Sequence, residues 1–170
     1  STHYHQNFPW FGFSMSSVGD FKKNVAPLGF GRVSDLVYRS AYPGSRSLPF
    51  IKQLGLKSMI CLSPNDIKDE LEAFCKDESI ELFRVDIKYN QDPFVTMSHD
   101  KVNDILDIAL ADTNQPVLIF CLHGKVRTGC VVACLRKRLN WSMSSIIAEF
   151  EQFSEPDGGL CDLQFIDAFD

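Results

Sequence analysis

The segment from Val117 to Gly129 holds a cysteine and an arginine at a spacing that could transfer a phosphoryl group. Cys121 ends the apolar run Val-Leu-Ile-Phe-Cys, and Arg127 follows it by six positions. The run predicts a buried strand, and the amphipathic pattern after the loop predicts a helix. The thiol would then lie at a helix N-terminus, where the helix dipole and backbone N–H groups favour both a thiolate and a phosphate.

The loop between the two residues supplies groups that could bind a phosphate. Its backbone N–H groups can converge on one point and form an anion nest. Arg127 adds a planar guanidinium that matches two phosphate oxygens, and the Thr128 hydroxyl can stabilise the sulfur as it leaves a phosphocysteine. The residues predicted to bind substrate are Leu122, His123, Gly124, Lys125, Val126 and Arg127, with Lys88 from outside the loop.

Two of these residues have plain alternatives. Lys125 and Lys88 could instead be solvated surface lysines, and for Lys88 that interpretation is the stronger one. His123 is expected at the rim of the pocket, because no second His or Cys stands near it at the spacing of a metal site. We therefore do not expect His123 to bind a metal.

Apolar runs alternate with helical patterns from Leu36 onward, which is typical of an α/β layer structure. Ser98 is the expected N-cap of the third helix, and Ser47 and Gly55 are expected to bound the first. Strands are predicted at 36–39, 57–62, 81–86 and 116–121. Helices are predicted at about 47–55, 66–76, 98–111, 127–139 and 144–153, with a last short helix from 162.

The chain is predicted to hold one domain. Residues 1–30 combine irregular Gly and Pro with many aromatic side chains, so we expect an extended segment that packs on the domain formed by residues 31–170. No apolar run is long enough to span a membrane, and the first residues lack the order of a secretion signal. We expect a cytoplasmic protein.

Charge and cysteine content exclude further classes. Seventeen basic and 22 acidic side chains give a formal net charge of −5, which argues against a general nucleic-acid surface. The six cysteines show no paired C-x-x-C spacing, and several stand in apolar stretches, so most are expected to be buried free thiols.

The spacing C-x5-R-T matches the signature of the cysteine-dependent protein tyrosine phosphatase superfamily. Within it the chain resembles the plant and fungal atypical dual-specificity phosphatases over about residues 25–170. The blocks that carry the resemblance are Val37–Pro43, Asn90–Val95, Gly124–Cys130 and Cys134–Lys137, with Phe150 and Asp162–Phe165.

This resemblance implies a compact phosphatase fold with a central, mainly parallel sheet flanked by helices. It implies hydrolysis of phosphate esters with Cys121 as the nucleophile and Arg127 as the clamp on the phosphate and the transition state. Several members of the family remove the β-phosphate from the 5-position of inositol pyrophosphates, and phosphotyrosine activity is also attributed to the group. The implied partner is therefore a phosphorylated small molecule or a phosphoprotein, and the resemblance implies no metal or organic cofactor.

A general acid must protonate the leaving oxygen. In the superfamily this is an Asp on a loop roughly 30 residues before the cysteine. Asp92 precedes Cys121 by 29 residues and Asp86 by 35. We favour Asp92, because Asn-Gln-Asp-Pro reads as a loop whereas Asp86 ends a strand; a solvated turn is the alternative for Asp92.

Three loop positions depart from the family pattern. Phe120 replaces the histidine that precedes the nucleophile, and His123 and Val126 replace an arginine and a histidine. Phe120 cannot donate a hydrogen bond, so we expect a less acidic thiol and slower turnover. The other two changes remove positive charge from the rim, and the acidic turn 154–159 stands where relatives usually carry basic residues.

Three functions remain open. The first is an inositol pyrophosphate phosphatase, which the family blocks and Lys125 favour. The second is a protein tyrosine or dual-specificity phosphatase, which the reduced charge of the rim favours. The third is a weakly active homologue that binds a phosphorylated ligand, which Phe120 favours.

Overall fold

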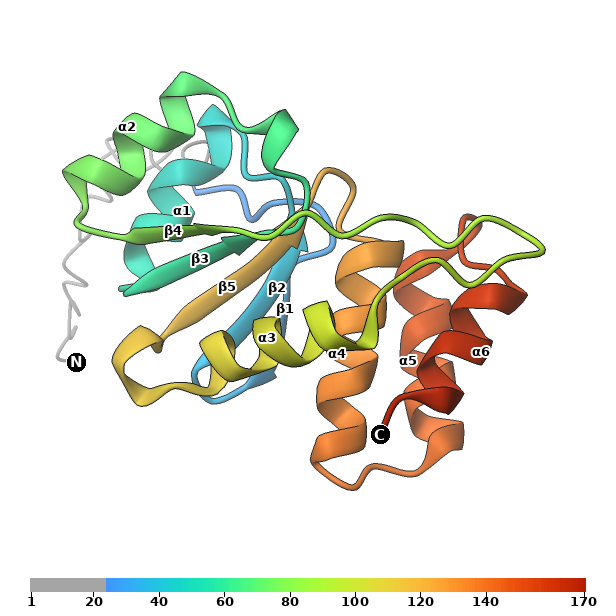
Figure 1. Ribbon diagram of the computed structural model, residues 1–170. Helices are drawn as coiled ribbons and strands as arrows, with labels where there is room; N and C mark the ends of the chain where they lie inside the picture. Colours follow the sequence, from blue (N-terminus) through green and yellow to red (C-terminus); the bar gives the residue numbers. More distant parts are fainter. Residues whose placement is uncertain (1–23) are drawn as a thin grey trace, which may run out of the picture.

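The computed structural model describes residues 24–170, and residues 1–23 of the expected N-terminal segment lie outside the described part. A five-stranded sheet with the order β1-β2-β5-β3-β4 forms its centre (Figure 1). Strand β1 is antiparallel to β2, and the other pairs are parallel. The strands are Gly31–Ser34 (β1), Val37–Ala41 (β2), Ser58–Cys61 (β3), Glu81–Arg84 (β4) and Val117–Cys121 (β5).

Strand β5 lies in the middle of the sheet, between β2 and β3. All five of its residues are buried, which explains why its sequence is apolar without alternation. Its register pairs Cys121 with Ala41 at the carboxyl end of β2, and Phe120 with Cys61 at the end of β3. The parallel arrangement thus brings the loops that follow these strands to one edge of the sheet, where α/β proteins bind their ligands.

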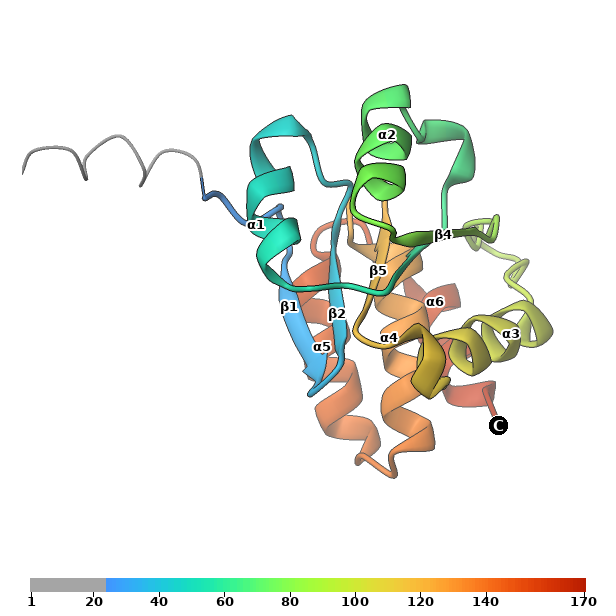
Figure 2. The same ribbon diagram turned by 90° about the vertical axis from the view of Figure 1, so that its left-hand side faces the viewer.

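Helices cover both faces of the sheet. Figures 1 and 2 show α1 and α2 on one face and α3 to α6 on the other. Helix α4 contacts α3, α5 and α6, and most of its residues are buried. The helices are Leu48–Gln53 (α1), Asp69–Asp77 (α2), His99–Leu110 (α3), Val126–Arg138 (α4), Met143–Ser154 (α5) and Leu160–Ala168 (α6).

Each face of the sheet has its own apolar cluster. Phe120 belongs to the cluster under α1 and α2, and Cys121 belongs to the larger cluster under α3 to α6. Consecutive residues of a strand point to opposite faces, so the cysteine and the phenylalanine before it lie in different layers.

The predicted α/β architecture is confirmed, and the differences are local. Helix α2 begins at Asp69 because residues 64–66 form a 3₁₀ turn, and β4 ends at Arg84. The expected cap Ser98 accepts a hydrogen bond from the Lys101 N–H, whereas Ser47 makes no capping hydrogen bond. Strand β1 was not predicted, since its four residues Gly-Arg-Val-Ser contain one apolar side chain and pair only at the edge of the sheet.

Residues 24–30 lead into β1 along the domain surface. The Phe30 ring lies 5.7 Å from the ring of Tyr38 and 4.8 Å from that of Phe50. The Leu28 carbonyl accepts a hydrogen bond from the Ala41 N–H at 2.8 Å. Across residues 24–170, none of the helices has the length and apolarity that crossing a membrane would require.

Candidate active site

Cys121 lies at the carboxyl end of β5, directly before the loop that leads into α4. Its side chain is 1% exposed, and the Thr128 hydroxyl donates a hydrogen bond to its sulfur at 3.0 Å. Thr128 belongs to the first turn of α4, so the sulfur lies at the N-terminal end of a 13-residue helix. The helix dipole and this hydrogen bond both favour negative charge on the sulfur.

The loop after Cys121 has six backbone N–H groups that are free to bind an anion. Within residues 24–170, the N–H groups of residues 122–127 donate no hydrogen bond to another part of the chain. Gly124 adopts a φ of +67°, and a Cβ at this position would lie 2.4 Å from the Ala41 nitrogen. The loop therefore packs directly against the backbone of β2 and depends on glycine at this point.

Arg127 is buried, with 8% of its surface exposed, and its guanidinium carbon lies 4.2 Å from the centre of the Tyr89 ring. Among the described residues its Nε has no hydrogen-bond partner. A cation stacked on an aromatic ring keeps its orientation while its N–H groups remain available to a ligand. Arg127 also lines a cavity of about 490 Å³, together with Asp86, Ile87, Lys88, Tyr89, Gln91 and Thr96.

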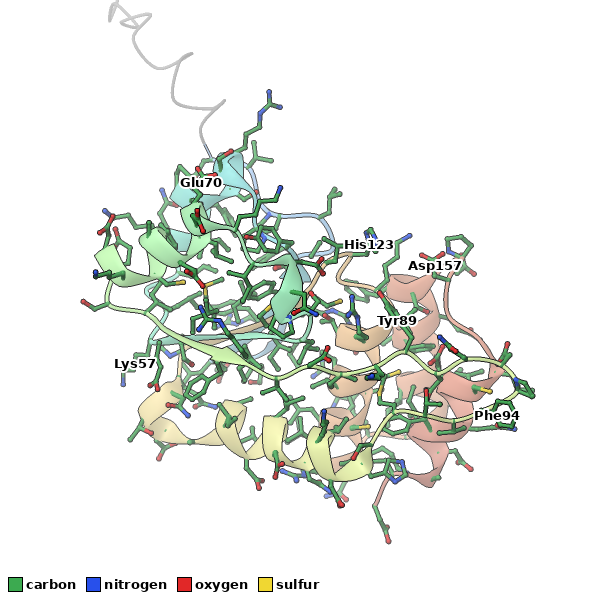
Figure 3. The ribbon with its side chains drawn as sticks, turned by 45° about the horizontal axis from the view of Figure 1, so that its top comes forward. Lys57, Glu70, Tyr89, Phe94, His123 and Asp157 are labelled. Carbon is green, nitrogen blue, oxygen red and sulfur yellow. The ribbon has the colours of Figure 1, made fainter. Side chains whose placement is uncertain are left out.

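Lys125 lies on the rim of the loop and is already paired. Its Nζ lies 3.3 Å from the carboxylate of Asp157, in the turn between α5 and α6. Figure 3 shows His123 and Asp157 in the upper right of the view, above Tyr89. The acidic turn therefore neutralises one of the cations predicted to bind phosphate.

The two candidate acids occupy different surroundings. Asp86 lines the cavity that Arg127 and Lys88 line. The Asp92 carboxylate lies beside Gly159 at the start of α6, 3.6 Å from the position a Cβ would take there, and its interaction with the Cys161 thiol raises the pKa of that thiol. The structure thus places Asp86, and not the favoured Asp92, on the cavity.

Two of the unusual loop residues have side chains that point away from solvent. Val126 is buried in the apolar cluster of α3 to α6. Its side chain therefore cannot contact a substrate, and only its backbone N–H can contribute to binding as predicted. Phe120 is fully buried, and its ring meets the Tyr42 ring edge-on at 5.8 Å. By contrast, Leu122 and His123 are exposed.

The other five cysteines are buried and, like Cys121, form no disulfide, as expected. Burial raises the pKa of Cys75 to about 11 and of Cys134 to about 12. Burial also raises the pKa of Cys61 and Cys130, and the interaction with Asp92 raises the pKa of Cys161 to about 11. These five thiols stay protonated at neutral pH and are poor nucleophiles.

Three residues contact the loop or Arg127 but were not predicted as site residues from the sequence: Arg39, Tyr89 and Asp157. A signal existed for Arg39, which is a charged residue inside a strand of otherwise small or apolar character. Asp157 belongs to a turn whose acidity was noted, but its pairing with Lys125 joins positions 32 residues apart. No local pattern marks Tyr89, because its contact with Arg127 arises only from the folded chain.

The fold and the loop together define a class of protein. A buried thiol at a helix N-terminus, followed by a loop of unpaired amides and by an arginine in the first turn of that helix, is the arrangement found in cysteine-dependent phosphatases. A family model described as "Tyrosine phosphatase family" matches residues 24–170, and the chain belongs to this family.

Comparison with known proteins narrows this class. The chain is 40% identical over 146 residues to the inositol diphosphatase DSP1 of Oryza sativa subsp. japonica and 38% identical over 147 residues to the probable tyrosine-protein phosphatase DG1060 of Dictyostelium discoideum. These alignments each cover 86% of the chain, but 66% of the rice protein and 89% of the Dictyostelium protein. The inositol diphosphatase SIW14 of Saccharomyces cerevisiae is 37% identical over 150 residues, which are 88% of the chain and 53% of the yeast protein. The chain thus spans just under two thirds of the rice relative and about half of the yeast one.

A solved structure of the Siw14 catalytic core superposes with a TM-score of 0.83 at 36% identity, over 88% of this chain and 89% of that one. The core of the yeast phosphatase bound to citrate gives a TM-score of 0.81 at 34% identity, over 86% and 88% of the two chains. The expected phosphatase fold is therefore confirmed.

Proposed function

We propose that this protein is a cysteine-dependent phosphatase that removes the β-phosphate from the 5-position of an inositol pyrophosphate. The observation that carries the proposal is the loop of unpaired amides from residue 122 to 127, with the Cys121 sulfur at its base. The names of the rice and yeast relatives support the choice of substrate.

The proposed reaction has two steps. The Cys121 thiolate attacks the β-phosphorus, so that an S–P bond forms, the P–O–P bridge breaks and the remaining phosphate of the inositol leaves with the bridging oxygen. Water then attacks the phosphocysteine, which releases orthophosphate and restores the thiolate. The loop amides and Arg127 stabilise the charge on the transferred group, and Thr128 stabilises the leaving sulfur.

An acidic side chain assists both steps by donating a proton to the leaving oxygen and then accepting one from water. Asp86 is in the better position for this role in the present conformation, because it lines the same cavity as Arg127. For Asp92 to act, the loop after β4 would have to carry its carboxylate away from Gly159 and Cys161.

Protein tyrosine phosphatase activity is the second candidate. The Tyr89 ring on the cavity wall and the neutralised Lys125 favour a substrate with fewer phosphates and an aromatic group. The 38% identity to the probable tyrosine-protein phosphatase of Dictyostelium also supports it.

Phosphate release from 5-diphosphoinositol pentakisphosphate and from a phosphotyrosine peptide tests these proposals. The parent should act faster on the inositol pyrophosphate, Cys121→Ser should release no phosphate, and the matched variant Cys134→Ser should keep the activity, because Cys134 is buried away from the loop in the middle of α4. Faster release from the peptide would favour the second candidate. Binding of both substrates without release by the parent would leave the third function, that of a binding protein.

A further inference from the structure

We propose that Arg39 is a positioning residue that holds the phosphate-binding loop in its active shape from behind. The inference rests on the proposed function, because it assigns a role in the same site. Arg39 stands in the middle of β2 and its guanidinium contacts the loop, whereas residues after β4, on the other side of β5, line the cavity with Arg127.

The surroundings of Arg39 show that its burial serves a particular contact. It is 2% exposed, although a buried guanidinium is costly unless its charge and donors are satisfied. Across residues 24–170, its Nε and Nη1 have no hydrogen-bond partner, and its one hydrogen bond runs from Nη2 to the Gly124 carbonyl at 3.3 Å. The only hydrogen bond that this buried cation makes there thus goes to the phosphate-binding loop.

Two further contacts hold the guanidinium in place. Its carbon lies 3.9 Å from the centre of the Phe153 ring, and its Nη1 lies 3.8 Å from the Glu149 carboxylate, both on α5. Burial lowers the pKa of Arg39 to about 10, and the nearby Glu149 partly opposes this shift, so the side chain remains a cation at neutral pH. The helix thereby fixes the arginine that in turn contacts the loop.

The contact with Gly124 sets the direction of an amide. In a planar trans peptide the C=O and N–H groups point in opposite directions. The Gly124 carbonyl points toward the Arg39 guanidinium, so the N–H of Lys125, in the same peptide unit, points away from that guanidinium. The Leu122 carbonyl accepts a hydrogen bond from the Tyr42 N–H at 3.3 Å, so the His123 N–H points away from the backbone that follows β2.

This direction is the one that an anion site requires. Arg127 and the residues after β4 line the cavity, and β4 lies on the other side of β5 from β2. Because the two carbonyls are held by Arg39 and by the Tyr42 N–H, the N–H groups of the same peptide units stay free for an anion. If Arg39 were absent, the Gly124–Lys125 peptide could rotate and present its carbonyl oxygen to the phosphate, which would repel it. Arg39 therefore acts on phosphate through the loop, without touching the substrate.

Arg136 offers a matched control. Its guanidinium is also buried, also pairs with Glu149, at 3.1 Å, and also stacks on an aromatic ring, that of Trp141 at 3.9 Å. It donates a hydrogen bond to the Val33 carbonyl and none to the loop. Its loss should therefore lower stability without changing the anion site.

The test measures tungstate binding by calorimetry, kcat/KM with 5-diphosphoinositol pentakisphosphate and Tm, for the parent, Arg39→Met, Arg39→Lys and Arg136→Met. Arg39→Met should weaken tungstate binding and lower kcat/KM, each by about tenfold or more, because an amide in the oxyanion site is misdirected. Arg39→Lys should lose less in the same direction, since a lysine keeps the charge but not the planar fork. Arg136→Met should stay within about threefold of the parent in tungstate affinity, even if its Tm falls as much as that of Arg39→Met.

Unchanged tungstate affinity in a folded Arg39→Met would overturn the proposal, and so would an equal loss in Arg136→Met. If Arg39→Met does not fold, Arg39→Lys decides, and parental affinity in that variant overturns the proposal. Failure of the proposed function gives a different result: the parent would bind tungstate and hydrolyse neither substrate. The tungstate series would still report on Arg39 in that case.

Discussion

The Lys125 ammonium lies 3.3 Å from the Asp157 carboxylate, so the acidic turn between α5 and α6 occupies a cation at the rim of the phosphate-binding loop. Lys125 and Asp157 are both partly exposed, and such a pair adds little to stability. Its larger effect is on the electric field at the entrance, where a substrate with many phosphates would otherwise meet a free ammonium.

Asp157→Asn should free Lys125 and lower the KM for 5-diphosphoinositol pentakisphosphate by about threefold, with little effect on kcat. Steady-state phosphate release at low ionic strength measures this change. Glu155→Gln alters the net charge equally, and Glu155 forms no ion pair among the described residues. Equal effects of both variants would mean that overall charge, rather than the pair, sets the affinity.

Tyr89→Leu should lower kcat/KM by about tenfold, because the ring that orients the Arg127 guanidinium is lost and a cation–π contact is worth about 0.5–2 kcal/mol. Tyr89→Phe keeps a ring at the same position and should retain most of the activity. Both variants are compared with the parent by steady-state kinetics. A loss in the Phe variant as large as in the Leu variant would show that the hydroxyl, and not the stacking, matters.

Asp86→Asn and Asp92→Asn separate the two candidate acids. Tyrosine is a leaving group of pKa about 10, whereas a phosphate ester that leaves from a diphosphate has a pKa of about 6. The variant that lacks the true acid should therefore lose much more activity on the phosphotyrosine peptide than on the inositol pyrophosphate. We expect this pattern for Asp86, because it lines the cavity. The same pattern in Asp92→Asn alone would show that the loop after β4 moves during the reaction.

Phe120→His should raise kcat near neutral pH by about threefold, because an imidazole at the end of β5 can hydrogen-bond to the loop and favour the thiolate. The same change places a polar ring in the apolar cluster under α1 and α2, so the free energy of unfolding should fall by about 1–3 kcal/mol. Phe120→Leu changes the packing without adding a donor. An unchanged rate in the His variant, or an equal rise in the Leu variant, contradicts this explanation.

Iodoacetamide at pH 7 should alkylate Cys121 before any other cysteine. A thiol of pKa about 11, as in Cys75 and Cys161, is ionised to only about one part in 10⁴ at that pH, since a raised pKa keeps the thiol protonated. Peptide mass spectrometry over time measures the order of labelling, and tungstate should slow labelling of Cys121 alone. Labelling of Cys130 or Cys134 at the rate of Cys121 would show that α4 opens in solution.

Much of the architecture could be predicted because the informative signals are local. The apolar run 117–121 and the pattern after it predicted β5 and α4, and the parallel sheet followed from the family resemblance. Strand β1 could not be predicted in this way, because an edge strand of four residues is stabilised by its pairing with β2 and carries little periodicity of its own.

The residues of the site that are neighbours in the sequence could be predicted, but the contacts between separate elements could not. Cys121, the loop residues and Thr128 follow one another closely, and the structure places the Thr128 hydroxyl 3.0 Å from the sulfur. The contacts from Tyr89 to Arg127, from Arg39 to Gly124 and from Asp157 to Lys125 each join separate elements. The orientation of the Asp92 side chain likewise depends on α6, which spacing alone cannot reveal.

Because Gly124 packs so closely against Ala41, the shape of the loop depends on the neighbouring strand β2. Residues 121–128 transplanted into another scaffold would keep the signature sequence but would lack the β2 backbone against which the loop packs. A protein engineer who wants this anion receptor elsewhere would have to move β2 along with it.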